Sequence, residues 1–195
     1  MTSLKLIVGL GNPGLQYERT RHNVGARCVT QLASRYGVGM TADVKFKGLV
    51  GRGNVEGVDL RLLLPTTYMN LSGESVAALA RFFKIEVAEI LVAYDEMAFE
   101  PGVVRLKQGG GDNGHNGIKS IRGSLANNGN FHRLRIGVGH PGDKNRVTGY
   151  LTQVKMPVQE TEIIDRATDF PAALLKQVVG GEWQAAMNTL HAGAS

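Results

Sequence analysis

The sequence has little of what several common kinds of protein require. Cys28 is the only cysteine among 195 residues, which excludes an intrachain disulfide and any Cys-x-x-Cys metal site. No apolar run approaches the roughly 20 residues that a membrane-spanning helix needs. The chain also does not start with a basic stretch followed by a long apolar run, as a signal peptide would. We therefore expect a cytoplasmic protein that has no membrane partner.

Other features that the sequence lacks exclude several kinds of functional site. Aromatic residues make up only 6% of the chain, too few for the stacking platform of many RNA-binding modules. No pair of histidines has ligand spacing with an acid, so we predict no metal site. No serine lies in a nucleophile-elbow sequence, which disfavours a serine esterase. We interpret the scattered His115, His132 and His140 as loop or structural residues.

Positive charge is concentrated in one part of the chain. The formal net charge is +5, and the segment 100–150 alone carries +5, with eight lysines and arginines against three acids. Residues 1–99 contribute +2 and residues 151–195 contribute −2. Such a segment permits nucleic-acid binding without requiring it.

Strand and helix patterns alternate along the chain. Short apolar runs indicate strands, and apolar residues three or four apart indicate helices. Asn23 and Gly37 are expected to begin and end the first helix, while Pro157 should start a C-terminal helix that Pro171 kinks or divides. The pattern predicts an α/β protein in which residues 1–195 form a single-domain three-layer α/β sandwich around a twisted mixed β-sheet. The expected strands are 4–9, 45–53, 57–64, 90–94, 103–106 and 134–138, and the expected helices lie over 24–36, over 76–83, after the glycine-rich loop, from 157 onward and over 183–190.

The segment Gly9–Gly14 matches G-x-G-x-x-G directly after a strand, as in dinucleotide-binding enzymes. That fingerprint requires a helix to begin at once, so that its N-terminus faces the pyrophosphate, but residues 17–22 intervene here. It also requires an acid about 20 residues further on to bind the ribose, and the chain has none between Glu18 and Asp43. We therefore reject a dinucleotide site and predict that the protein uses no cofactor.

Five polar residues lie near strand ends or helix starts: Asn12, His22, Asn70, Asp95 and Asn116. Because ligands of α/β sheets bind at the carboxyl ends of the strands, these side chains could converge. Neutral imidazole takes a proton from water near neutral pH, and a carboxylate on its other nitrogen fixes the tautomer. Asparagine amides donate to an oxyanion or to peptide carbonyls. The pattern therefore favours a water-activating enzyme over a non-catalytic RNA-binding module.

Five longer stretches within residues 6–150 contain these residues. They are Val8–Gly14, Thr20–Asn23, Pro65–Gly73, Asp95–Glu96 and Gly109–Pro141. In content and in order, these stretches resemble the bacterial peptidyl-tRNA hydrolase family, whereas residues 158–195 resemble it only loosely. The resemblance implies an enzyme that hydrolyses the ester bond between a peptide and the 3′ end of tRNA. It also implies a monomer whose partner is peptidyl-tRNA and which has no obligate protein partner.

The resemblance assigns roles to individual residues. It implies that His22 is the catalytic histidine, that Asp95 is its carboxylate partner and that Asn12 takes part in catalysis. It further implies one group of residues that bind the substrate and a basic group that contacts the tRNA. The first group comprises Tyr17, Tyr68, Met69, Asn70 and Asn116, and the second comprises Lys107, Arg135, Lys144 and Arg146.

Overall fold

Strand β1 lies at the centre of the sheet because its four residues, Leu6–Gly9, are all buried. In the computed structural model, which describes residues 2–192, β1 pairs in parallel with β4 on one side and with β5 on the other. The described strands form one seven-stranded sheet in the order β2-β3-β4-β1-β5-β7-β6. The other strands are β2 (Thr41–Asp43), β3 (Gly48–Val55), β4 (Val58–Pro65), β5 (Ile90–Glu96), β6 (Val104–Gln108) and β7 (His132–Gly137).

The sheet is mixed, as the sequence predicts. Strands β4, β1, β5 and β7 run parallel, whereas β3 pairs antiparallel with β4 and β6 pairs antiparallel with β7. The β3–β4 hairpin turns at Glu56 and Gly57, whose φ angles of 48° and 87° suit a tight two-residue turn. The expected start of β3 at residue 45 is wrong, because Val44–Phe46 forms a 3-10 turn in which the Asp43 side chain accepts from the Lys45 amide.

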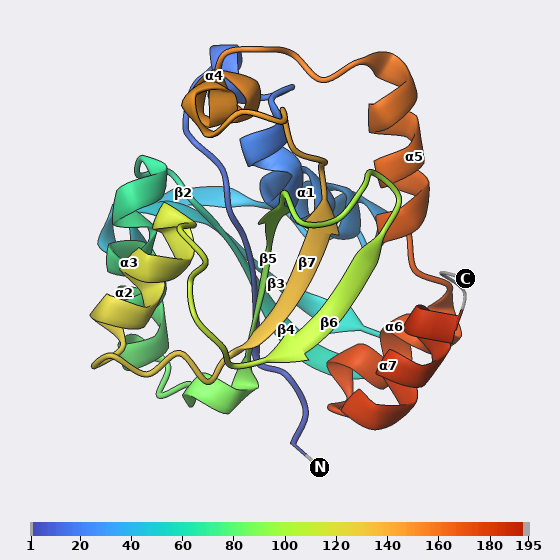
Figure 1. Ribbon diagram of the computed structural model, residues 1–195. Helices are drawn as coiled ribbons and strands as arrows, with labels where there is room; N and C mark the ends of the chain where they lie inside the picture. The colour runs from blue at the N-terminus through green and yellow to red at the C-terminus, as the bar shows by residue number, and fades with distance from the viewer. Residues whose placement is uncertain (1, 193–195) are drawn as a thin grey trace.

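Helices cover both faces of the sheet, which confirms the three-layer α/β prediction (Figure 1). The core on one face includes residues of α1, α5 and α6. Helices α2 and α3 pack on the other face, where Val76 and Ile118 join the second core. The described helices are α1 (Val24–Arg35), α2 (Ser72–Phe82), α3 (Asn116–Ser124), α4 (Val147–Thr152), α5 (Val158–Thr168), α6 (Ala172–Val179) and α7 (Trp183–Ala192).

The C-terminal helices close the edge of the sheet. Pro171 divides the expected helix completely, since α5 ends before it and α6 begins after it. Helix α7 packs beside the edge strand β6, where His191 Nε2 accepts from the Leu106 amide at 3.3 Å. The Trp183 ring stacks on His132 at a centroid distance of 3.7 Å. Burial lowers the pKa of His132 to about 4, so this ring is neutral near pH 7. This packing is consistent with the interpretation of His132 as a structural residue.

Because the central strands are parallel, the segments that follow them lie at one edge of the sheet. Asn12 follows β1, Met69 and Asn70 follow β4, and Asp95 lies near the end of β5. Helix α4 lies at the same end of the sheet, close to the chain that leads into α1 (Figure 1). The polar residues of the sequence pattern therefore gather at the carboxyl edge, where ligands of α/β sheets bind.

Candidate active site

His22 and Asp95 form a buried hydrogen-bonded pair. His22 lies in a 3-10 turn, Arg21–Asn23, directly before α1. The start of α1 is pressed against β5: a Cβ on Gly25 would lie 2.1 Å from the Ala93 carbonyl oxygen, so only glycine fits there. This close approach brings His22 Nδ1 to 2.8 Å from Asp95 Oδ2. The structure thus joins the two residues that the sequence analysis paired.

The charge of Asp95 controls the protonation of His22. Burial disfavours the imidazolium, but the Coulombic attraction of Asp95 and its hydrogen bond outweigh that effect and raise the pKa of His22 above its usual value. Burial also acts to raise the pKa of Asp95, yet interactions with His22 and His115 lower it well below its usual range. Asp95 is therefore ionised at neutral pH.

A second histidine binds the same carboxylate. His115 Nε2 lies 2.9 Å from Asp95 Oδ1, and the His115 and His22 ring centroids are 5.0 Å apart. The sequence analysis interprets His115 as a loop or structural residue and does not predict this contact, since nothing in the local sequence shows that the loop reaches β5. The signal available was its position directly before Asn116 in a stretch that resembles the family.

The hydrogen bonds assign the proton of each imidazole. His115 Nδ1 accepts from the Ile118 amide at 3.3 Å, so Nε2 carries the proton and donates it to Asp95. Because Asp95 is ionised and accepts only, His22 Nδ1 must also donate. The Nε2 lone pair of neutral His22 is then free to act as a base.

A cleft opens beside this hydrogen-bonded chain. Its lining includes His22, Asp95, His115 and Asn116, and helix α4 contributes Val147, Thr148, Leu151 and Thr152. Glu96 and Asp112 also line it, so the cleft holds two further acidic groups. The sequence analysis assigned no site residue to α4, whose Val147 and Leu151 add apolar side chains to a lining made mostly of polar groups.

Among the described residues, the Asn12 side chain forms a hydrogen bond through its oxygen and none through its nitrogen. Asn12 Oδ1 accepts from the Met69 amide at 2.7 Å, which fixes the amide plane and leaves the Nδ2 group as the available donor. Gly117 allows Met69 to lie beside the histidines, because a Cβ on residue 117 would lie 2.6 Å from Met69 Sδ and 3.1 Å from His115 Cε1. The Asn12–Met69 pair therefore lies next to the chain formed by His22, Asp95 and His115.

Asn12, Met69 and three further residues of the predicted substrate group lie outside the cleft lining. Tyr17 ends a 3-10 turn, Leu15–Tyr17, and Tyr68 is 57% exposed. Asn70 is exposed in the 3-10 turn Met69–Leu71 that follows β4. Within residues 2–192, none of these three side chains has a hydrogen bond that ties it to His22 or Asp95. The structure places Asn70 directly after Met69 and leaves its side chain open to a ligand.

Four cations share one face of β6 and β7. Arg105 lies opposite Arg135, and Lys107 lies opposite Arg133. Directly paired residues and residues two apart point to the same side of a sheet, so all four lie on the face that α2 and α3 also use. Figure 1 shows no helix in front of β7 and β6 in this view.

These four cations are not equivalent. Arg133 is 2% exposed and donates to the carbonyls of Gly110, Gly111 and Gly129, so it holds the glycine-rich loop. Arg135 lies 3.9 Å from a Glu96 oxygen and is partly screened. Lys107 is exposed, and the ion pairs among residues 2–192 include none for it.

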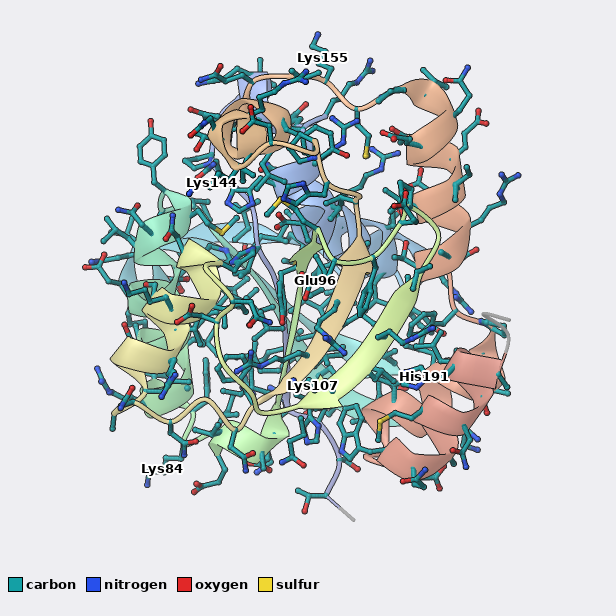
Figure 2. The ribbon with its side chains drawn as sticks, in the orientation of Figure 1. Lys84, Glu96, Lys107, Lys144, Lys155 and His191 are labelled. Atoms are coloured by element: carbon teal, nitrogen blue, oxygen red, sulfur yellow. The ribbon has the colours of Figure 1, made fainter. Side chains whose placement is uncertain are left out.

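Lys144 and Arg146 lie at the other end of β7. Both are exposed in the 3-10 turn Lys144–Arg146 that leads into α4. Figure 2 shows Lys144 beside α4 and Lys107 near the far end of β6, with Glu96 between them. The predicted basic residues therefore lie in two groups, one in the turn before the cleft-lining helix α4 and one on the open face of β6 and β7.

The group His22, Asp95 and His115 has the ligand types of a metal site, with facing atoms within 4.8 Å of one another. The sequence argument against a metal overlooked this group, because the three residues are far apart in the chain. However, both histidine nitrogens that face Asp95 carry protons in the hydrogen-bond scheme. A metal would have to displace both protons and turn His115 Nδ1 into a donor toward the Ile118 amide. We therefore interpret the group as a hydrogen-bonded chain.

A second cavity, on the opposite face of the sheet, is largely apolar. Cys28, Val29, Phe170 and Leu175 contribute to its lining. Burial raises the pKa of the Cys28 thiol to about 12, so the thiol is neutral and unreactive at pH 7. The cleft at the carboxyl edge, where the titratable groups gather, is the candidate active site.

An α/β sheet whose carboxyl edge carries a buried imidazole–carboxylate pair beside an open cleft has the architecture of an enzyme. The family model described as peptidyl-tRNA hydrolase matches residues 6–195. The chain therefore belongs to the peptidyl-tRNA hydrolase family, a family of ester hydrolases.

Individual relatives agree over nearly the whole chain. Peptidyl-tRNA hydrolases of Azotobacter vinelandii and Pseudomonas aeruginosa are 53% and 52% identical over 191 residues, which is 98% of this chain and of each relative. The crystal structure of peptidyl-tRNA hydrolase from Acinetobacter baumannii matches with a TM-score of 0.91 and 50% identity. It covers 97% of this chain and 96% of that one. In the described residues, no helix is long and apolar enough to cross a membrane.

Proposed function

We propose that this enzyme hydrolyses the ester bond between a peptide and the 3′ end of tRNA, and so recycles tRNA from prematurely released peptidyl-tRNA. Membership of the family supports the reaction. The single observation that carries the mechanism is the hydrogen bond of 2.8 Å from His22 Nδ1 to Asp95 at the wall of the cleft. It leaves the Nε2 lone pair available on a histidine that lines the cleft.

His22 acts as the general base in this proposal. Its Nε2 takes a proton from water as the water attacks the ester carbonyl carbon. Asp95 fixes the tautomer and stabilises the imidazolium that forms. When the tetrahedral intermediate collapses, the same proton passes to the departing ribose oxygen. An ester has a good leaving group compared with an amide, so this pair suffices without a covalent nucleophile.

Asn12 supplies the donor to the oxyanion. Its Oδ1 is already bound to the Met69 amide, so the Nδ2 group keeps one orientation before substrate binds. A fixed donor directed at developing charge stabilises the transition state more than the ground state. We assign this role to Asn12 because its amide is the one held rigidly by the backbone.

The remaining polar residues bind the peptide. Asn70 and Asn116 are exposed beside the site, so their amides are free to contact main-chain carbonyls, which all peptides share. We assign the apolar and aromatic contacts to Tyr17, Tyr68 and Met69. The neutral amides of Asn70 and Asn116 offer no countercharge to the ammonium group of a free aminoacyl-tRNA, which would lose part of its hydration beside them.

The tRNA occupies the basic face in this proposal. Lys107 and Arg135 contact phosphates along β6 and β7, and Lys144 and Arg146 contact phosphates near the mouth of the cleft. The support is the common face of the strand residues and the exposure of Lys107, Lys144 and Arg146. Phosphate contacts of this kind bind tRNA whatever its sequence.

The test is release of peptide from an N-acylated aminoacyl-tRNA, with the free aminoacyl-tRNA as control. We expect rapid hydrolysis of the first and slow hydrolysis of the second. Tight binding of tRNA without release would instead support a non-catalytic RNA-binding module.

We also propose that residues 1–195 act as one domain, in the cytoplasm, as a monomer without an obligate protein partner. The support is the single sheet shared by all described strands. Light scattering on the eluting protein should give the mass of one chain, 21.0 kDa.

A further inference from the structure

Asp95 accepts a hydrogen bond on each of its two carboxylate oxygens. His22 Nδ1 lies 2.8 Å from Oδ2, and His115 Nε2 lies 2.9 Å from Oδ1. The Asp95 side chain is 1% exposed, and the side chains of His22 and His115 are 10% and 9% exposed. In the proposed mechanism only the His22 contact has a role. The second contact places a buried imidazole on the carboxylate that controls the base.

The His115 ring connects Asp95 to the first turn of α3. Its Nδ1 accepts from the Ile118 amide at 3.3 Å, which is the N-cap contact of that helix. Asn116, proposed to bind the substrate, is the first residue of α3. One ring therefore joins the substrate-binding end of a helix to the carboxylate partner of His22.

We propose that His115 is a positioning residue: its Nε2–H fixes the rotation of the Asp95 carboxylate and partly neutralises its charge, and so sets the basicity of His22. The inference rests on the proposed function only in taking His22 as the base. Without the His115 donor, Oδ1 would carry unshared negative charge, which would hold the His22 proton more tightly. Fewer enzyme molecules would then have a neutral His22 at a given pH below its pKa.

The other charged groups near this chain do not provide the same control. Tyr94 packs edge-on against His115, with ring centroids 5.0 Å apart, and burial raises its pKa, so it is neutral at pH 7. Glu96 and Asp112 line the same cleft, and neither has a hydrogen bond or ion pair to His22 in the described chain. Arg21, the sequence neighbour of His22, pairs with Glu160 at 2.7 Å.

Two substitutions separate the two hydrogen bonds of His115. In His115→Gln the side-chain amide nitrogen reaches as far as imidazole Nε2, so it can donate to Asp95 but loses the helix cap. In His115→Asn the side-chain oxygen replaces Nδ1 and keeps the cap, but the donor to Asp95 is lost. The variants have similar size and no charge, so each serves as the control for the other.

The experiment measures the pH profile of kcat/KM on N-acylated aminoacyl-tRNA, the His22 titration by NMR and the melting temperature. For His115→Asn we expect the acid limb and the His22 titration to move up by about one pH unit, which lowers kcat/KM about tenfold below that pKa. The melting temperature should also fall, because the buried Asp95 carboxylate loses one of its two hydrogen bonds. For His115→Gln we expect a pH profile close to the wild type and a lower melting temperature, because the cap is lost.

Two results would overturn the inference. One is a His22 titration that is the same in both variants and in the wild type, which would mean that His115 does not act through Asp95. The other is a displaced pH profile in His115→Gln with a normal one in His115→Asn, which would give the helix cap the functional role. The NMR titration needs no turnover, so it tests His115 even if the wild type does not cleave the substrate. A wild type without cleavage would refute the proposed function alone.

Discussion

The side chain of Asn23 binds the backbone of Asn12 on both sides. Asn23 Oδ1 accepts from the Asn12 amide at 2.9 Å, and Asn23 Nδ2 donates to the Asn12 carbonyl at 3.0 Å. The sequence predicts that Asn23 caps α1, and it does occupy the N-cap position. Within the described chain, however, its side chain makes no capping hydrogen bond. The residue after the proposed base thus holds the proposed oxyanion donor in place.

Replacing Asn23 should therefore slow catalysis through Asn12. Asn23→Ala removes both hydrogen bonds, and a displacement of about 1 Å in the Asn12 amide should lower kcat by roughly 10²-fold. If Asn23 acts through Asn12, the double variant with Asn12→Ala should be no slower than Asn12→Ala alone. Losses that multiply would contradict this coupling. Asn54→Ala, which removes one asparagine–backbone bond in the remote β3–β4 hairpin, is the matched control.

The pH dependence of the enzyme should follow the titration of His22. Because the attraction of Asp95 raises the pKa of His22, the acid limb of kcat/KM should lie above the ordinary histidine value of about 6.5. Turnover needs the neutral ring, so it should fall as the pH decreases through that limb. His22→Ala should lower kcat by roughly 10²–10⁴-fold and remove the limb while substrate still binds. A variant with near-normal turnover would exclude His22 as the base.

Asp95→Asn tests the carboxylate separately. The neutral amide cannot stabilise the imidazolium, and it would present a donor to one of two nitrogens that already carry protons. We therefore expect a large loss of kcat and a lower pKa for His22. An acid limb that moves to higher pH in this variant would contradict the role given to Asp95.

The three asparagines should differ in kinetics. Asn12→Ala removes a donor that acts mainly in the transition state, so kcat should fall by roughly 10²–10³-fold. Asn70→Ala and Asn116→Ala remove contacts to the bound peptide, so KM should rise with a smaller change in kcat. Unchanged constants in all three variants would refute a shared binding site.

Hydrolysis should not depend on a metal. The protons on His22 Nδ1 and His115 Nε2 already satisfy Asp95. Activity after exhaustive chelation should equal that of untreated enzyme when the substrate tRNA is kept folded. A loss that Zn²⁺ restores would show that the His22, Asp95 and His115 group binds a catalytic ion.

The sequence predicts the fold better than the details of the site. Helix and strand periodicity placed most elements, because the apolar residues that define the period are the ones that pack in the two cores. The 3-10 turn at residues 44–46 was missed since it depends on a local contact from Asp43. Pairing of His22 with Asp95 was predicted by strand-end logic and by the family resemblance together.

The contacts of His115 and Asn23 could not be predicted from local sequence. His115 meets Asp95 only because the loop before α3 folds back over β5. Asn23 has the residue type and position of a helix cap. Its type alone does not show which backbone groups its side chain binds. Both residues form tertiary hydrogen bonds between distant segments, which leave no periodic signal in the chain.

Binding of the tRNA body should be separable from ester hydrolysis. Lys107 and Arg135 lie on the open face of β6 and β7, apart from the His22–Asp95 pair. Each phosphate contact releases counterions, so each lost contact should reduce the log–log salt slope by roughly 0.7–0.9. Lys107→Ala and Arg135→Ala should therefore weaken full-length peptidyl-tRNA and flatten its salt dependence. Lys176→Ala, which removes an exposed lysine of α6, controls for the change in net charge.

The decisive comparison uses a minimal substrate that keeps the peptide ester and lacks the tRNA body. We expect kcat/KM for this substrate to be nearly unchanged in both variants and independent of salt, because the catalytic groups are untouched. Lys107 should give the clearer effect, since Arg135 is already partly paired with Glu96 at 3.9 Å. Equal losses on both substrates would mean that these cations support the catalytic site or the fold. No loss on either would mean that both are ordinary solvated side chains, and the tRNA would then have to lie on another face.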